Sequence, residues 1–413
     1  MTYILCSTLP EWRSKSLGLC RYQEVYLPLA HIILTAAILI TLATSIFLAL
    51  RYRNIKLYGA QPSNLMAFTA ILFTSGLDVG LIMFPLTEFP VYAREAPYGF
   101  TNPLAIEFGF WGFLVWGFYF LTTFYFCVIE PRLKLFEIWW VALANNIVII
   151  ATCAFTGFLF LSYLPNYITD ITPVARYGLV AAVVLGAVLS STDIRYVKWL
   201  SYASFALFGL LILSLMITND MGVGDLLASG QNLGGYFSNL DKFISPQTDY
   251  HAFYLFWWFA WSIMIGQFVA RFFGGIKPLQ LLIALLILPS IPIAVWFSVL
   301  FHYHSEEIVL AGYLQIAMVV VGIIFVLNSL DSLTRLYSEN LNLTVKRLGM
   351  PLYILGHWGL LFGLILLYQF TPLKIEWIGM VVIALYGCIY VLIYQRRDGL
   401  QKLSQTRLRV HVQ

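Results

Sequence analysis

Long apolar stretches separated by short polar segments make up most of this chain. A membrane-spanning helix needs about 20 mostly apolar residues, and about eleven stretches reach that length. Strand-like alternation with regular turns is not sustained, so the pattern favours helices over a β-barrel. It predicts an all-α polytopic membrane protein with spans near 28–50, 63–87, 104–128, 138–164, 173–191, 197–218, 251–270, 278–302, 308–330, 350–370 and 376–395.

Composition supports this interpretation. Of the 413 residues, 60% are hydrophobic and 11% are charged, whereas ordinary soluble proteins have roughly 45–50% apolar and about 25% charged residues. So little charge cannot cover a soluble body of this size, and the abundant apolar surface excludes disorder. The net charge of +4 does not indicate a nucleic-acid partner, because membrane proteins carry cationic loops for topological reasons.

The positions of the charges predict an orientation. With a cytoplasmic C-terminus, seventeen of the 24 Lys and Arg residues fall in cytoplasmic loops, as the positive-inside rule requires. An odd number of spans then puts the N-terminus outside. Cys6 and Cys20 both lie in this outer N-terminal segment, where a disulfide is chemically allowed. Clusters of Cys and His that would indicate a metal site are lacking in the sequence.

The second predicted span carries a carboxylate near mid-membrane. Asp78 stands between Gly76-Leu77 and Gly80, and glycine weakens a helix enough to leave backbone carbonyls free to coordinate an ion. A carboxylate at this depth is a functional-site hypothesis by default. The alternative is a glycine-lined helix contact in which Asp78 pairs with a neighbouring donor.

Two groups of aromatic residues could either bind a ligand or serve only in packing. Trp116 and Tyr119 are neighbours on a helix, and Trp111 lies within an arc of about 140° of them on the same wall. A second cluster opens the seventh span and includes Trp257, Trp258 and Trp261. Such rings can hold a quaternary ammonium group by cation–π attraction. The alternative is interface anchoring or core packing, which is common for tryptophan in membranes.

Polar residues in two further spans are candidates for an ion site. Asn328-Ser329-Leu330-Asp331-Ser332 lies at the predicted end of the ninth span, where small oxygen donors facing an unwound helix could bind sodium. A polar helix end near the cytoplasmic surface explains the same residues. Thr152 and Thr156, four residues apart, make the fourth span polar as well.

Taken together, these residues resemble the betaine/choline/carnitine transporter family over about residues 28–395. Ala70 to Gly80 followed by Glu88 resembles the family's glycine box and its downstream acid. The Trp-x4-Trp-x2-Tyr spacing and Trp258 resemble its substrate cage. Further blocks are Ile55-Lys-Leu-Tyr-Gly59, Val197-Lys-Trp-Leu-Ser201, Phe253-Tyr254, Trp257-Trp258, Trp261-Ser262, Phe268-Val-Ala-Arg271, Leu288-Pro-Ser290 and Trp296-Phe-Ser298.

The resemblance implies a leucine-transporter-like core of two inverted five-helix repeats in a bacterial inner membrane. The domains expected from it are an outer segment with one peripheral helix (1–61), the first repeat (62–218), an outer linker with an amphipathic helix at Gly234–Phe243 (219–248), the second repeat (249–395) and a basic cytoplasmic tail (396–413). The linker resembles the connector on which family members form homotrimers.

The same resemblance implies the roles of individual residues. The substrate-binding candidates are Trp111, Trp116, Tyr119, Trp257, Trp258, Trp261 and Asp78. The ion-coupling candidates are Gly76, Leu77, Asp78, Gly80, Asn328, Ser329, Thr152 and Thr156. We expect a quaternary-ammonium substrate, no organic cofactor, and Na⁺ or H⁺ as the coupling ion.

Several departures from the family pattern leave the coupling open. The chain is expected to lack the family's first helix, and the loop after Arg271 has lost most of its positive charges. Asp78 stands where many members have glycine, and Asn328 stands where sodium-coupled members have threonine. Ser204 occupies the place of the arginine found in sodium-independent exchangers.

The sequence thus predicts a secondary transporter of choline, glycine betaine or carnitine type that works by alternating access. Two alternatives stay open: a transport-inactive receptor-like paralogue and an ion-independent exchanger. An enzyme is not expected, because the spans contain no HExxH motif and no phosphate-binding loop.

Overall fold

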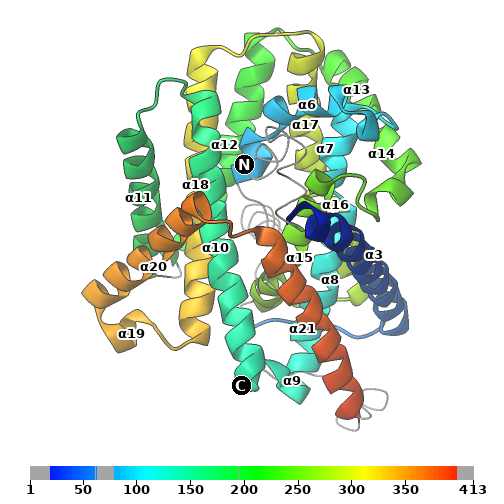
Figure 1. The fold of residues 1–413 in the computed structure, drawn as a ribbon, viewed down its shortest axis with the longest axis vertical. Helices are drawn as coiled ribbons and strands as arrows, with labels where there is room; N and C mark the ends of the chain where they lie inside the picture. Colours follow the sequence, from blue (N-terminus) through cyan, green and yellow to red (C-terminus); the bar gives the residue numbers. More distant parts are fainter. Residues whose placement is uncertain (1–18, 61, 63–78, 194, 398–413) are drawn as a thin grey trace.

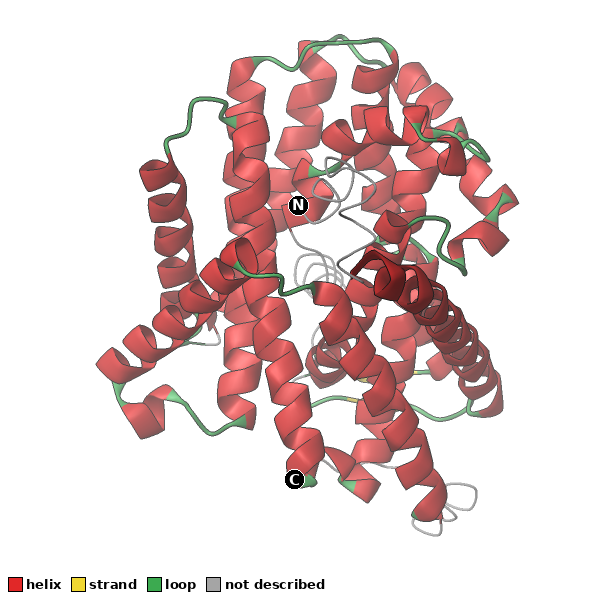
Figure 2. Ribbon diagram, in the orientation of Figure 1, coloured by secondary structure: helices red, strands yellow, loops and turns green. Residues whose placement is uncertain are grey.

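Almost all of the chain that the computed structural model describes is helical (Figure 2). The description covers residues 19–60, 62, 79–193 and 195–397, without the side chains of 19–28, 197 and 198. Ten helices within it are long and apolar enough to cross a membrane, and they match ten of the predicted spans. The other predicted span, near 63–87, is described only from residue 79 onward. Cys6 lies outside the described residues. The all-α polytopic fold is therefore confirmed, while the domain boundaries stay a prediction.

The helices and strands have the following bounds. Up to the middle of the chain they are α3 (Leu19–Arg51), β1 (Leu57–Tyr58), α5 (Val79–Met83), α6 (Pro85–Arg94), η1 (Ala96–Tyr98), α7 (Pro103–Trp111), α8 (Leu114–Phe124), the π-helical turn η2 (Tyr125–Ile129), α9 (Glu130–Leu133), η3 (Leu135–Glu137), α10 (Trp139–Tyr167), α11 (Pro173–Ser190) and α12 (Arg195–Thr218). The rest are α13 (Val223–Gln231), α14 (Gly234–Ser238), η4 (Leu240–Phe243), α15 (Asp249–Val269), η5 (Ala270–Phe272), β2 (Gly274–Ile276), α16 (Pro278–Ile287), α17 (Ser290–Ser305), α18 (Gly312–Asn340), α19 (Val345–Leu348), α20 (Met350–Phe370) and α21 (Ile375–Gln395).

Burial separates the spanning helices into an inner and an outer group. Between 67% and 89% of the apolar stretch is buried in the spans formed by α7 and α8, by α10, by α15 and by α18. For α3, α11, α12, α20 and α21 the share is 22–28%, as expected for helices that face lipid. Figure 1 shows α10 and α18 side by side, with α11 and α20 flanking them. The inner group carries most of the predicted site residues.

Two glycines, one on α15 and one on α21, let helix α15 pack closely against its neighbours. A Cβ atom at Gly266 of α15 would come within 2.2 Å of the Thr122 side chain of α8. A Cβ atom at Gly379 of α21 would come within 2.4 Å of the Phe256 carbonyl oxygen of α15. Small residues at such contacts let membrane helices pack closely. The aromatic rings of α15 are therefore held against α8.

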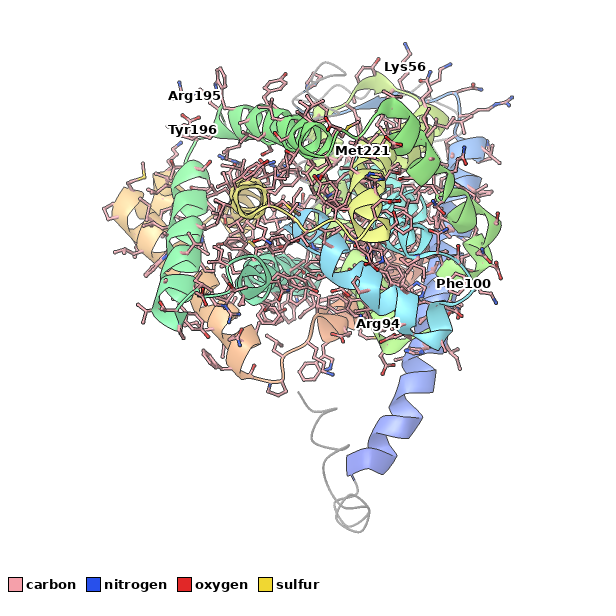
Figure 3. All side chains as sticks on the ribbon, turned by 90° about the horizontal axis from the view of Figure 1, so that it is seen from above. Lys56, Arg94, Phe100, Arg195, Tyr196 and Met221 are labelled. Carbon is pink, nitrogen blue, oxygen red and sulfur yellow. The ribbon has the colours of Figure 1, made fainter. Side chains whose placement is uncertain are left out.

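A short antiparallel sheet connects two loops that the charge pattern places on the cytoplasmic side. Leu57 of β1 pairs with Ile276 of β2, and Tyr58 pairs with Gly274. Gly59 follows so closely that a Cβ atom there would meet the Arg271 backbone at 2.3 Å. The block Ile55–Gly59, singled out in the sequence, thus fastens the chain after α3 to the end of α15. Lys56 and Arg195 point outward at the periphery when the molecule is seen from above (Figure 3).

Helix α18 is longer than the sequence pattern predicted. The expected span ended at residue 330, but the helix continues to Asn340. Asn328–Ser332 therefore lies inside the helix, and its predicted position at a helix end is wrong. The polar residues that suggested an end are buried, and Arg335 donates to Asp331 Oδ1 at 3.0 Å.

The predicted amphipathic helix Gly234–Phe243 forms in two pieces. Helix α14 ends at Ser238, and η4 begins at Leu240, because Asn239 between them has non-helical backbone angles. Tyr236 of α14 is fully buried, and its ring packs on Phe108 of α7 with centroids 5.2 Å apart. The linker therefore packs against the site-bearing span.

Candidate functional site

The third predicted span is broken in the middle of the candidate cage. Helix α7 ends at Trp111, Gly112 is extended, and Phe113 has φ 48°, a conformation that residues other than glycine rarely adopt. Helix α8 then carries Trp116 and Tyr119. The prediction that these three rings share the wall of one continuous helix is therefore wrong. The break turns the chain between Trp111 and Trp116 and presents their rings from two separate helices.

Side chains from other elements satisfy the backbone N–H groups that the break releases. The Phe113 N–H donates to Ser290 Oγ of α17 at 2.9 Å, and the Leu114 N–H donates to the Tyr236 hydroxyl at 3.3 Å. An unsatisfied backbone group at this depth would cost several kcal/mol. Ser290 and Tyr236 therefore stabilise the break.

Two candidate tryptophans satisfy the carbonyl groups on the other side of the break. The Trp258 Nε1–H donates to the Phe110 carbonyl oxygen at 2.6 Å. The Trp116 Nε1–H donates to the Trp111 carbonyl oxygen at 3.3 Å. These hydrogen bonds fix the orientation of both indoles, and the bond from Trp258 attaches α15 to the end of α7.

The structure brings most of the predicted aromatic residues together. Trp111 lies edge-to-face with Trp257 and Trp258, with ring centroids 5.3 and 5.2 Å apart. Trp116 contacts Tyr119 at 5.1 Å, and Tyr119 contacts Trp258 at 6.4 Å. We call these five residues the aromatic cluster. It joins α7, α8 and α15, which are far apart in the sequence.

Trp261 is less clearly part of this group. Its side chain is 1% exposed, and its Nε1 has no hydrogen-bond partner among the described residues. The ring contacts found in that part of the chain do not connect it to the aromatic cluster. Asp78, the remaining substrate-binding candidate, lies outside the described residues.

Phe84 and Tyr163 extend the aromatic cluster, and sequence reasoning missed both. Phe84 joins α5 to α6, and its ring centroid lies 6.0 Å from that of Trp111 and 6.2 Å from that of Trp257. Tyr163 of α10 stacks on Phe84 at 3.9 Å. No spacing rule in the sequence predicts their positions, because the folding of α5, α6 and α10 brings them next to the aromatic cluster.

Two buried carboxyl groups lie beside the aromatic cluster. Glu88 of α6 accepts a hydrogen bond from the Tyr163 hydroxyl at 2.7 Å. Glu107 of α7 is fully buried and accepts from Trp111 Nε1 at 2.9 Å and from the Tyr92 hydroxyl at 2.7 Å. Sequence reasoning passed over Glu107, although its position in an apolar stretch, four residues before Trp111, is a signal.

Four of the ion-coupling candidates lie on two helices that pack together. Thr152 and Thr156 are on α10, and Asn328 and Ser329 are on α18; all four are fully buried. The hydroxyls of both threonines and the side-chain amide of Asn328 have no hydrogen-bond partner among the described residues. Such oxygens are the donors that sodium prefers.

The glycine-box members of the ion-coupling set are almost all outside the described residues. Gly76, Leu77 and Asp78 belong to the part of the chain that is not described. Gly80 lies in α5, where its carbonyl oxygen accepts from the Phe84 N–H at 2.9 Å. Helix α5 packs on α18, with Val79 against Gly322. The structure therefore brings α5, α10 and α18 together, but it does not assemble the full set.

Asp331 and Arg335 connect α18 to the loop after α11. Besides its ion pair with Asp331, Arg335 donates to the carbonyl oxygens of Ser190 at 3.3 Å and Asp193 at 3.1 Å. Asp193 lies between two spans, where its hydrogen bond with Arg195 lowers its pKa to about 2. This network of charges stabilises the packing of α18 against α11.

An open pocket of about 440 Å³ lies between α6, the end of α10 and the end of α17. It is lined by Leu86, Thr87, Pro90, Arg94, Asn166, Tyr167, Tyr303, His304, Glu307, Ile308, Leu310 and Gln315. Tyr167 also donates to the Met83 carbonyl oxygen at 2.8 Å, next to Phe84. Because the rings of the aromatic cluster are at most 1% exposed, a ligand reaches them only when the surrounding elements move apart.

This arrangement places an aromatic cluster in the core of a membrane-spanning protein, and comparisons with known proteins show what the chain is similar to. Residues 140–304 match the model of the BCCT, betaine/carnitine/choline family transporter. The match includes Trp257, Trp258 and Trp261 and begins after Tyr119. It confirms the resemblance to this transporter family over that part of the chain.

Named relatives agree with the family match. The chain is 23% identical to the glycine betaine transporter OpuD of Bacillus subtilis over 281 residues, which cover 57% of this chain and 54% of the relative. It is 24% identical to the high-affinity choline transport protein of Escherichia coli over 308 residues, with 63% and 45% covered. An uncharacterized transporter of Mycobacterium tuberculosis is 26% identical over 280 residues, with 56% and 47% covered.

The chain spans about half the length of the curated relatives it matches. A solved Na⁺-coupled sialic acid symporter covers 88% of this chain and 82% of its own, at 14% identity and a TM-score of 0.42. That likeness is too low to support a conclusion about this chain. The matched family and the named relatives are transporters, not enzymes.

Proposed function

We propose that this protein is a secondary active transporter of quaternary-ammonium compounds of choline, glycine betaine or carnitine type. The observation that supports this most strongly is the aromatic cluster, in which Trp111, Tyr119 and Trp258 meet from three helices in the buried core. The family match and the relatives named as betaine and choline transporters point to the same substrate class.

The chemistry of the cluster suits this substrate. A trimethylammonium group offers no hydrogen-bond donor, so cation–π attraction of roughly 0.5–2 kcal/mol per ring is the main directed force available to hold it. Two of the indole N–H groups, those of Trp116 and Trp258, already donate to backbone carbonyls. Their rings therefore present mainly apolar, electron-rich surface to a ligand.

Alternating access fits the burial of the cluster. The rings are closed off from both sides in this conformation, so binding requires an opening between the inner helices. Phe84 and Tyr163, which stack on each other beside the cluster, form an outer layer, and Tyr167, which lines the 440 Å³ pocket, donates to the carbonyl oxygen of Met83, the residue before Phe84. We propose that this layer opens toward the pocket to admit substrate from the outer side.

Coupling to Na⁺ or H⁺ forms the second part of the proposal. Thr152, Thr156 and Asn328 supply buried oxygens without partners among the described residues, which is consistent with a sodium site between α10 and α18. Asp78 would instead take up a proton or pair with a cationic substrate. Replacing Asp78 by Gly tests both roles, because unchanged ion dependence and unchanged substrate preference would exclude them.

Transport into proteoliposomes tests the proposal. The purified chain is reconstituted, and uptake of radiolabelled choline and glycine betaine is measured with an inward Na⁺ gradient, with an inward H⁺ gradient and with neither. We expect accumulation above equilibrium with one of the gradients. Uptake only in exchange for internal substrate would make the protein an exchanger, and binding without uptake would make it receptor-like.

A further inference from the structure

Glu107 lies next to Trp111 of the aromatic cluster. It precedes Trp111 by one helical turn in α7, and its side chain is fully buried. One carboxyl oxygen accepts from Trp111 Nε1 at 2.9 Å and the other accepts from the Tyr92 hydroxyl at 2.7 Å. Both oxygens are thus engaged on the outside of the cluster, so the carboxyl group acts on a ligand through Trp111 rather than by contact.

The donors around Glu107 match an ionised carboxylate. An indole N–H can only donate, and the Tyr92 hydroxyl has no hydrogen-bond partner other than Glu107 among the described residues. Two donors meeting two acceptor oxygens favour the charged form, complete burial opposes it, and a cation held in the aromatic cluster would favour it again. Within the described part of the chain, the ion pairs do not include Glu107, so its charge is not neutralised by Lys or Arg.

We propose that Glu107 is a specificity-determining residue that makes the cluster prefer cationic head groups to neutral groups of the same shape. A carboxylate hydrogen-bonded to Nε1 increases the electron density of the Trp111 ring and adds its own attraction for a cation across that ring. It also fixes the indole orientation. This inference rests on the proposed quaternary-ammonium site and specifies how that site distinguishes charge from shape.

The test compares choline with its neutral carbon analogue, in which a tert-butyl group replaces the trimethylammonium group. Affinities of both ligands are measured by competition on the purified chain in lipid nanodiscs. Glu107→Gln keeps an acceptor for Trp111 and a group that can hydrogen-bond Tyr92, but it removes the charge. We expect choline to bind about tenfold more weakly to this variant, with the analogue changed by less than about twofold.

Tyr92→Phe is the matched control, because it removes the second hydrogen bond to Glu107 and keeps the charge. We expect the ratio of the two affinities in this variant to stay near that of the unaltered chain. A merely structural role for Glu107 would instead change both ligands equally in the Gln variant, or neither of them. Either result would overturn the inference.

The affinities of the unaltered chain for the two ligands provide a second test, which does not depend on whether a variant folds. Choline must bind at least about tenfold more tightly than the carbon analogue if both the rings and Glu107 favour a cation. Equal affinities would show that neither the rings nor Glu107 favours a cation, and they would refute the role of Glu107 even though choline still binds. If neither ligand bound, the proposed function would fail first, and the inference would fall with it.

Discussion

Trp258 combines two roles at the scale of the single residue. Its ring faces Trp111 and Tyr119, and its N–H satisfies the Phe110 carbonyl oxygen at the end of α7. The spacing of aromatic residues was enough to predict that these rings matter. It could not predict Phe84, because the role of this residue depends on the packing of α6, whereas Glu107 carried a signal as a carboxyl group four residues before Trp111 in an apolar stretch.

Substitution of Trp258 separates these two roles. Trp258→Leu should weaken choline binding by at least about tenfold, since it removes a ring worth up to about 2 kcal/mol together with a buried hydrogen bond. Trp258→Phe keeps a ring without the N–H and should lose less affinity. Trp199→Leu is the control, because Trp199 is 74% exposed on the outer helix α12. Equal affinity for the Leu variant and the unaltered chain would remove Trp258 from the site.

At the scale of the element, the break between α7 and α8 sets the shape of the site. The apolar pattern predicted the span itself, because hydrophobicity over about 20 residues marks a membrane helix. The pattern could not locate the break, since Gly112 and Phe113 are both common inside such helices. Ser290 and Tyr236 stabilise it, and they lie more than a hundred residues away in the sequence. The extension of α18 was missed for a related reason: the Asp331–Arg335 ion pair makes polar residues compatible with burial.

Ser290→Ala should destabilise the break. It leaves the Phe113 N–H without its acceptor, which we expect to lower the free energy of unfolding by about 1–2 kcal/mol. Ser298→Ala on the same helix is the matched control, because among the described residues Ser298 Oγ donates only to the Ala294 carbonyl of its own helix. Thermal unfolding in detergent measures the difference. Equal unfolding temperatures for the two variants would show that Ser290 does not support the break.

At the scale of the whole molecule, the positive charges in the loops predict which side faces the cytoplasm. Lys56 and Arg195 belong to the side with the larger number of Lys and Arg residues, and Arg94 belongs to the other. Hydropathy alone predicted the positions and order of the ten spans that the structure describes. How the inner helices surround the aromatic cluster did not, because it depends on packing between helices distant in the sequence.

Cysteine labelling in whole cells tests this orientation. Arg94→Cys should react with a thiol reagent that cannot cross the membrane, and Lys56→Cys should react only after the cells are opened. Both side chains are exposed in the structure, so accessibility to solvent does not distinguish them. Cys6 and Cys20, which the charge pattern places on the outer side, and the exposed Cys388 are first replaced by Ala in both variants. The opposite labelling pattern would invert the predicted topology.

The central claim is that the aromatic cluster of α7, α8 and α15 holds a quaternary-ammonium group. An experimental structure of the chain with choline bound in lipid nanodiscs tests it most directly. The account predicts density for the trimethylammonium group in van der Waals contact with Trp111, Tyr119 and Trp258. Choline density confined to the outer pocket near Asn166 and Glu307, with the aromatic cluster still closed, would contradict it.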